Sequence, residues 1–120
     1  MEDKGHTTWK LFGFYLLIIL FMLFAESVSG QVIVSEFNAG WNKSNKVEWL
    51  EELTDCEITK VDIVKDPKFQ KKHKIVVVPT IIIFKDGEEV KRFQADISFS
   101  MKATRKEVQE IINEQLMSDF

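Results

Sequence analysis

Two apolar runs separated by a single proline form the strongest pattern in the chain. Ile75–Val78 and Ile81–Phe84 are rich in β-branched residues, which favour strands. Pro79 lies between them. Because proline cannot donate a backbone hydrogen bond to a sheet, it predicts that a loop becomes a strand there. The X-Pro bond at such a corner is a candidate for the cis isomer. Asp86-Gly87 then predicts a two-residue hairpin turn, after which Glu88–Phe93 returns as an outer strand.

Upstream of the proline, the pattern predicts a strand–helix–strand unit. Gln31–Phe37 carries apolar residues on both faces, as expected of a central strand with a parallel neighbour. A helix is expected from Asn42 to Leu53, with Asn42 as its N-cap. Its apolar stripe recurs at every third position and is formed by Val47, Leu50 and Leu53, broadened by Trp49. Cys56–Val64 alternates apolar and polar residues and is predicted to be the next strand.

Two further helices flank the proline segment. Asp66-Pro67 predicts the start of a short surface helix over Lys68–His73, anchored by Phe69 and with a solvated His73. Near the C-terminus, Thr104 and Glu107 form a capping box. The stripe behind it predicts a terminal amphipathic helix and consists of Val108, Ile111, Ile112 and Leu116. The expected order from residue 31 is therefore β-α-β-α-β-β-α, an α/β arrangement.

The first 30 residues have the layout of an export signal. A polar start is followed by Leu11–Ala25, which has no charged residue, and later by the small-residue tripeptide Val28-Ser29-Gly30. Cleavage there would leave a domain of residues 31–120. The alternative is an uncleaved anchor over Trp9–Val28, about 20 residues and just long enough to cross a bilayer. The sequence thus predicts an exported protein of the periplasm or cell envelope, anchored in the inner membrane if the segment is retained.

Charge and composition argue against several classes of function. The formal net charge is −3 and no basic stripe is visible, which speaks against nucleic acid as a partner. Cys56 is the only cysteine in the sequence. The chain therefore cannot form an intramolecular disulfide, and it has no Cys-x-x-Cys pair and no cysteine cluster that could bind zinc. The two histidines, His6 and His73, are isolated from each other and from other ligand types. We expect no metal and no other cofactor.

The chain from Gln31 to about Leu116 resembles the thioredoxin family. The segments that carry the resemblance are VIVSEFNAGW before the first helix, VDIVKDP before the short helix, and KIVVVPTIIIFKDGEEV around Pro79. The resemblance implies a thioredoxin-like fold with a central mixed sheet and flanking helices, lacking the family's first strand and helix. It also implies that Pro79 is cis and lies beside the family's active site.

The family's active-site motif is altered in this chain. Trp-Cys-Gly-Pro-Cys-Lys becomes Trp41-Asn42-Lys43-Ser44-Asn45-Lys46, with asparagine in place of both cysteines. Dithiol exchange needs a thiolate, which a helix N-terminus stabilises, and a second thiol that resolves the mixed disulfide. An amide supplies neither, so the family mechanism is excluded. The resemblance then implies a binding surface for an extended peptide, formed by Trp41, Asn42, Asn45, Val78 and Pro79.

Two further residues are candidates for chemistry. Glu36 falls where the family has a buried aspartate that assists proton transfer. We expect its carboxylate to be held by a nearby lysine such as Lys60, or to reach solvent; residual binding or proton chemistry is the alternative. Cys56 is expected to be a buried, inert thiol. A reactive thiol or an intermolecular disulfide is the alternative for Cys56.

Three hypotheses about function remain open. The first is a redox-inactive, exported thioredoxin-like domain that acts as a protein-binding, peptide-binding or scaffolding module. The second is a monothiol redox protein that uses Cys56. The third is a membrane-anchored subunit of a larger envelope complex, which requires that residues 9–28 stay in place.

Overall fold

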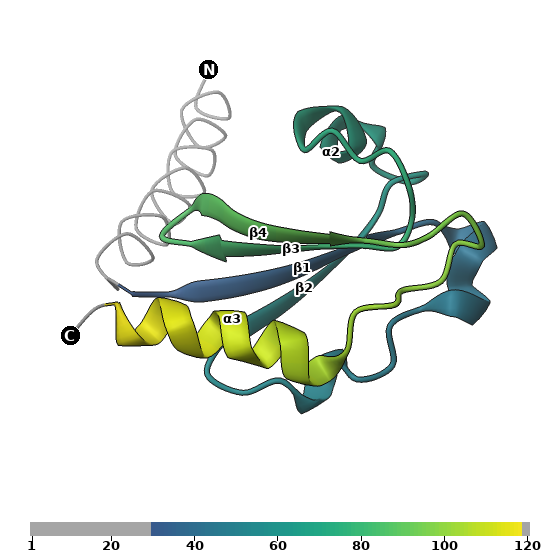
Figure 1. Ribbon diagram of the computed structural model, residues 1–120. Coiled ribbons are helices and arrows are strands. Elements are labelled where there is room, and N and C mark those ends of the chain that lie inside the picture. The colour runs from purple at the N-terminus through teal and green to yellow at the C-terminus, as the bar shows by residue number, and fades with distance from the viewer. Residues whose placement is uncertain (1–29, 119–120) are drawn as a thin grey trace, which may run out of the picture.

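A single mixed sheet organises residues 30–118, the part of the chain that the computed structural model describes (Figure 1). The elements are β1 (Val32–Asn38), the 3-10 helices η1 (Gly40–Asn45) and η2 (Leu50–Glu52), β2 (Glu57–Asp62), α2 (Pro67–Lys72), β3 (Thr80–Lys85), β4 (Glu88–Gln94) and α3 (Arg105–Met117). The strand order is β2-β1-β3-β4, in which β1 and β2 are parallel and the other neighbours are antiparallel. The predicted α/β class and the central position of the first strand are confirmed.

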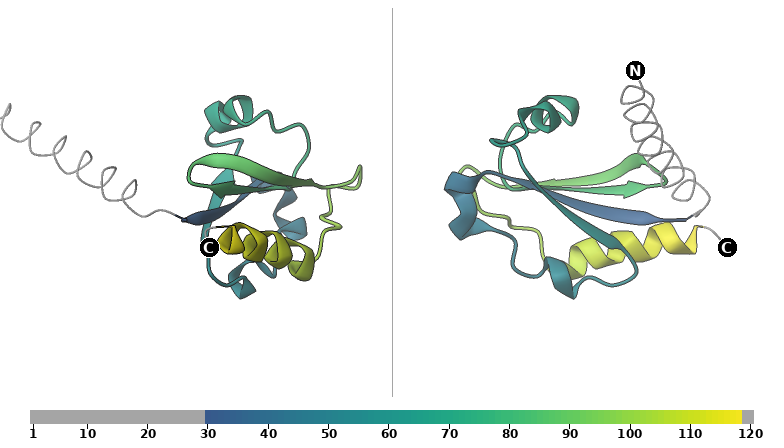
Figure 2. Two further views of the ribbon diagram at one scale, coloured as in Figure 1. Left: turned by 60° about the vertical axis from the view of Figure 1, so that its left-hand side comes forward. Right: turned by 180° about the vertical axis from the view of Figure 1, so that it is seen from behind.

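The sheet buries apolar side chains on both faces, because β1 and β3 lie inside it. One core cluster packs Val34 and Ile83 of the sheet against Val108 and Ile112 of α3. The other contains Phe37 and Ile82, with further apolar side chains from the loops: Ala39, Ile63, Ile75 and Val78. Phe69 of α2 packs against this second cluster. Figure 2 shows the result, with α3 and α2 on opposite sides of the sheet.

The local signals around the proline and at the last helix are confirmed. The Val78-Pro79 peptide bond is cis, and β3 begins at the next residue. Asp86 and Gly87 have φ angles of 53° and 85°, the positive values that a type I′ turn requires, and they join β3 to β4. At the start of α3, the Thr104 side chain accepts a hydrogen bond from the Glu107 N–H and completes the capping box.

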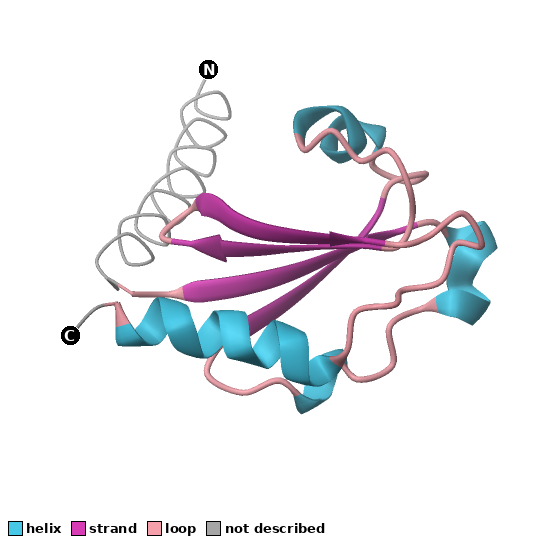
Figure 3. Cartoon of the chain, viewed as in Figure 1, coloured by secondary structure: helices cyan, strands magenta, loops and turns pink. Residues whose placement is uncertain are grey.

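The predicted helix from Asn42 to Leu53 is wrong. Two separate 3-10 helices occupy this segment, joined and followed by loops (Figure 3). Val47, Leu50 and Leu53 of the apolar stripe are nonetheless buried, as predicted, although only Leu50 lies within a 3-10 helix. Asn42 is not an N-cap either: it lies inside η1 with a non-helical φ of −107° and ψ of 19°. Asparagine and serine compete with the helix for backbone hydrogen bonds, which weakens an α-helix here.

The segment around α2 follows the prediction except at its last residue. Asp66 precedes Pro67 as expected, although its side chain makes no capping hydrogen bond. His73 is not simply solvated: its ring lies 5.2 Å from the ring of Phe37 and 5.5 Å from that of Phe84, centroid to centroid. Burial lowers the pKa of His73 below its usual value. This imidazole is therefore part of the packing beneath α2.

The N-terminal predictions fall on residues that the structure does not describe. The apolar run and the candidate anchor over residues 9–28 both lie before residue 30. Between residues 30 and 118, no helix has the length and apolar character needed to cross a bilayer.

Candidate functional site

Three loops meet at the end of the sheet where β1 finishes. The register places Phe37 of β1 opposite Thr80 of β3, and Thr80 opposite Gln94 of β4. The segments that adjoin these strand ends are therefore neighbours: η1 after β1, residues 75–79 before β3, and residues 95–101 after β4. A backbone hydrogen bond of 3.0 Å from the Ala95 N–H to the Pro79 carbonyl joins the last two.

The side chain of Asn42 connects all three loops. It is 3% exposed, and its amide nitrogen lies 3.4 Å from the Val78 carbonyl oxygen and 3.2 Å from the Phe99 carbonyl oxygen. The same nitrogen donates to Oδ1 of Asn38 at 3.1 Å, and Oδ1 of Asn42 accepts from the Asn45 amide at 2.9 Å. An amide has two N–H bonds, so one is shared between two acceptors. The hydrogen-bonding capacity of Asn42 is thus used within the protein.

The exposed part of this site is a pair of aromatic rings. Trp41 is 64% exposed, and its ring meets that of Phe99 edge to face at a centroid distance of 5.2 Å. We call Trp41 and Phe99 the aromatic ridge. Phe99 adopts a φ of 60°, in the left-handed region. Ile97, in the same loop, is almost fully exposed.

The predicted binding residues do come together, but in two layers. Trp41 is at the surface and Asn45 is half-buried, whereas Asn42, Val78 and Pro79 are buried beneath. The buried residues therefore support the surface and do not present their side chains to a ligand. Sequence analysis missed Phe99. The signal available was a phenylalanine and an isoleucine two residues apart within a predicted loop.

Among residues 30–118, no lysine forms a salt bridge with the buried carboxyl group of Glu36. Glu36 is 4% exposed, and its Oε2 accepts a 2.8 Å hydrogen bond from the Val47 N–H. The expected partner, Lys60, instead forms its salt bridge with Glu51. Burial raises the pKa of Glu36, while the Val47 hydrogen bond and the charges of Lys60 and Lys46 act in the opposite direction. A backbone N–H, not a lysine, therefore holds this carboxylate.

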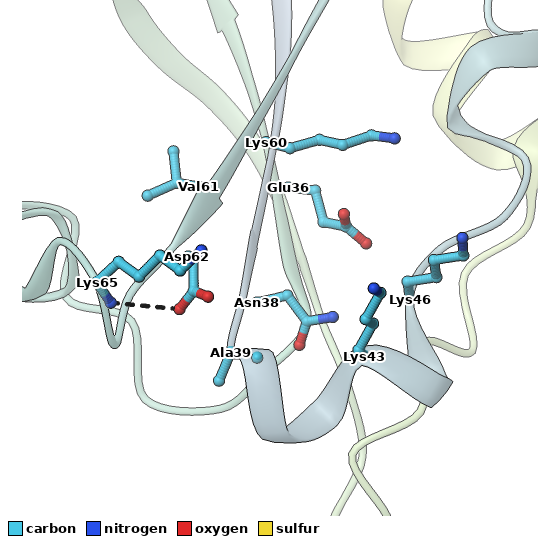
Figure 4. A pocket seen from close by; sticks show the side chains of 10 residues that line it. Glu36, Asn38, Ala39, Lys43, Lys46, Lys60, Val61, Asp62 and Lys65 are labelled. Atoms are coloured by element: carbon cyan, nitrogen blue, oxygen red, sulfur yellow. Dashed lines mark hydrogen bonds between the residues drawn. The ribbon is translucent and has the colours of Figure 1, made fainter.

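A surface pocket of about 390 Å³ lies beside Glu36 (Figure 4). Its charged lining residues are Glu36, Lys43, Lys46, Lys60, Asp62 and Lys65, and we call it the lysine pocket. Gly40 also lines it and allows η1 to approach β2, since a Cβ at this position would lie 3.3 Å from Oδ2 of Asp62. The pocket and the aromatic ridge thus share η1.

Cys56 lies away from these features. It precedes β2, and the register places Glu57 beside Ile33 at the start of β1, the opposite end of the sheet from η1. The thiol is half-buried against the first core cluster. Burial raises the pKa of Cys56, and the charge of Asp55 adds to this effect. Within residues 30–118, no group of three or more histidine, cysteine, aspartate or glutamate side chains could hold a metal ion.

Comparison with known proteins gives a consistent result. The Thioredoxin family model matches residues 22–110, most of the chain. The chain belongs to the thioredoxin family. A thioredoxin of Chlamydia trachomatis serovar D is 33% identical over 75 residues, which cover 58% of this chain and 74% of that protein. A thioredoxin of Staphylococcus haemolyticus is 32% identical over 92 residues, covering 71% of this chain and 86% of that protein.

Solved thioredoxin structures resemble this one. The X-ray structure of Fasciola hepatica thioredoxin aligns with a TM-score of 0.55 and 31% identity, covering 72% of this chain and 83% of the other. The predicted family and fold are therefore confirmed. Within the thioredoxin family motif, Asn42 and Asn45 stand at the two cysteine positions. The first of these positions holds the buried amide that connects the three loops.

Replacing Asn42 is expected to destabilise the fold. Asn42→Ala leaves the buried Val78 carbonyl without this donor, and it should lower the free energy of unfolding by about 2–3 kcal/mol. Ser44→Ala, at an exposed position of the same 3-10 helix, is the matched control and should cost less than about 1 kcal/mol. Urea denaturation followed by circular dichroism measures both values. Equal losses for the two variants would contradict a connecting role specific to Asn42.

Glu36 should make stability fall with rising pH. Because its folded-state pKa is raised, its contribution is fully present below the usual value of 4.5 and is lost as the pH rises through the folded-state pKa. Glu36→Gln keeps an oxygen that can accept from Val47 but removes the titration. The stability of the variant relative to wild type should therefore increase between about pH 4 and about pH 7. Urea denaturation across this range tests it, and a constant difference would refute it.

Proposed function

We propose that this thioredoxin-family domain has exchanged dithiol chemistry for protein binding, and that it takes an extended peptide segment of a protein partner at the aromatic ridge. The observation that carries the proposal is the exposed Trp41–Phe99 pair held above the buried Asn42 amide. The function is that of a binding or scaffolding module of an exported protein.

The groups at the site support the proposed loss of dithiol chemistry. Asn42 and Asn45 cannot form a thiolate, a mixed disulfide or a disulfide. The remaining thiol, Cys56, lies at the other end of the sheet, and its raised pKa lowers the fraction of reactive thiolate at neutral pH. These observations favour a binding role over a monothiol mechanism.

The aromatic ridge has the properties of a binding surface. Aromatic rings contribute large apolar contact areas. Tryptophan is also enriched among the residues that dominate binding energy. The ridge is also fixed before binding, since the Phe99 carbonyl is held by Asn42. Fixing the surface in advance reduces the entropy lost on association. The carbonyl of Val78 is already engaged, so apolar contacts supply most of the proposed affinity.

Export is the second part of the proposal. It rests on the uncharged run Leu11–Ala25 and the tripeptide Val28-Ser29-Gly30. Cleavage after Gly30 would release the domain into the periplasm or envelope. Retention of the same segment would tether the binding site to the inner membrane as part of a larger assembly.

Redox inactivity predicts no reduction of disulfides by this chain. With dithiothreitol as electron donor, wild type and Cys56→Ala should reduce insulin at the same background rate. The comparison isolates Cys56, because this is the only cysteine in the sequence. Turbidity of precipitating insulin B chain measures the rate. Faster reduction by wild type than by C56A would establish a monothiol activity and refute the proposal.

Removal of the tryptophan ring should abolish peptide binding. An immobilised full-length chain is incubated with a degenerate pool of twelve-residue peptides, and retained peptides are quantified by mass spectrometry. Trp41→Ala should reduce retention at least about tenfold, equivalent to roughly 1.4 kcal/mol. Met117→Ala, which removes an exposed apolar side chain of α3, is the control and should retain the wild-type set. Equal retention by both variants would show that the ridge is not the binding surface.

A further inference from the structure

The lysine pocket carries an excess of positive charge. Within residues 30–118, Lys43, Lys46 and Lys65 form no salt bridge, and the salt bridge of Lys60 is made with Glu51. Figure 4 shows the side chains of Lys43, Lys46 and Lys60 around the Glu36 carboxylate. Four ammonium groups therefore line a pocket that contains two carboxylates.

Both carboxylates of the pocket accept hydrogen bonds from backbone N–H groups. Glu36 accepts from the Val47 N–H and is buried. Oδ1 of Asp62 accepts from the N–H groups of Val64 at 2.9 Å and Lys65 at 3.4 Å. Within residues 30–118 neither carboxylate forms a salt bridge with a lysine, although the charge of Lys46 acts on Glu36, so Lys43 and Lys46 are not held in ion pairs. Both lysines are exposed, so their attraction for an anion depends on the salt concentration.

The position of the pocket identifies the anion it suits. Gly40 lines the pocket, and Trp41 of the aromatic ridge is the next residue, with Cα atoms about 3.8 Å apart. Lys43 of the pocket follows two residues later in the same 3-10 helix, so a peptide seated on Trp41 lies against the element that also lines the pocket. We propose that the lysine pocket receives an aspartate or glutamate side chain of the peptide whose apolar residue contacts Trp41. This inference rests on the proposed function and names the chemistry of the partner: an acidic residue within two positions of a large apolar one.

Matched peptide pools test this pairing on the full-length chain. Every peptide has phenylalanine at one fixed position. One pool carries a glutamate, and the other a glutamine, at one of the two positions before or the two positions after this phenylalanine, and each of these four placements is tested separately. Wild type should retain the glutamate pool about tenfold more strongly in at least one placement, at about 50 mM salt. The preference should shrink as added salt screens the charges.

Substitution of the lysines shows whether the pocket produces the preference. Lys43→Gln with Lys46→Gln should remove the preference and leave retention of the glutamine pool unchanged. Lys43→Arg with Lys46→Arg, which preserves charge, should keep it. Lys71→Gln with Lys72→Gln, on the exposed side of α2, alters the net charge by the same amount and should also keep it. Equal loss in this last variant would overturn the inference, since the effect would then be one of net charge.

The Trp41→Ala variant separates failure of this inference from failure of the proposed function. Equal retention of both pools by wild type, with both lost in W41A, would overturn the acidic-residue inference and support the aromatic ridge as a peptide site. Retention that survives W41A would refute the proposed function itself. A glutamate preference that needs both Trp41 and the Lys43–Lys46 pair supports the inference.

Discussion

One buried side chain, the amide of Asn42, links the loops at the end of the sheet where β1 finishes. It reaches the carbonyls of Val78 and Phe99 and thereby joins η1 to the segment before β3 and the loop after β4. A planar amide can do this because its NH2 group carries two N–H donors, while its oxygen accepts from Asn45. A thiol at the same position would be a weak donor and a weak acceptor. The residue that removes the family's nucleophile is thus also the residue that orders the surrounding loops.

The buried carboxylate of Glu36 depends on the same local structure. In a continuous helix, the Val47 N–H would donate to the carbonyl four residues earlier. Here Lys46 is extended, with φ of −60° and ψ of 151°, so η1 ends and the Val47 N–H is released to Glu36. Interruption of the helix therefore supplies the hydrogen bond that makes a carboxylate acceptable in the interior. It also leaves Lys43 and Lys46 free to line the adjacent pocket.

Sequence analysis succeeded where short-range chemistry decides the structure. Pro79, Asp86-Gly87 and Thr104–Glu107 each restrict their own backbone, and the strand boundary, turn and capping box they predict are present. It failed over residues 42–53, because a spacing of three predicts a continuous helix. The chain instead leaves η1 at Lys46 and buries its apolar residues from a loop and a second short 3-10 helix. The partner of Glu36 was missed for the same reason, and Phe99 because an apolar residue in a loop has no periodicity to interpret.

The backbone conformation of Phe99 opposes stability to the proposed binding role of its ring. A φ of 60° leaves the backbone of a glycine unstrained. For a residue with a bulky side chain, the same conformation costs about 1 kcal/mol or more. Glycine would relax the backbone and remove the ring that packs against Trp41. Selection for a sturdier domain alone would therefore favour loss of the phenylalanine, whereas selection for the aromatic ridge would retain it. A phenylalanine in this conformation therefore lowers the stability of the fold and at the same time keeps the aromatic ridge in place.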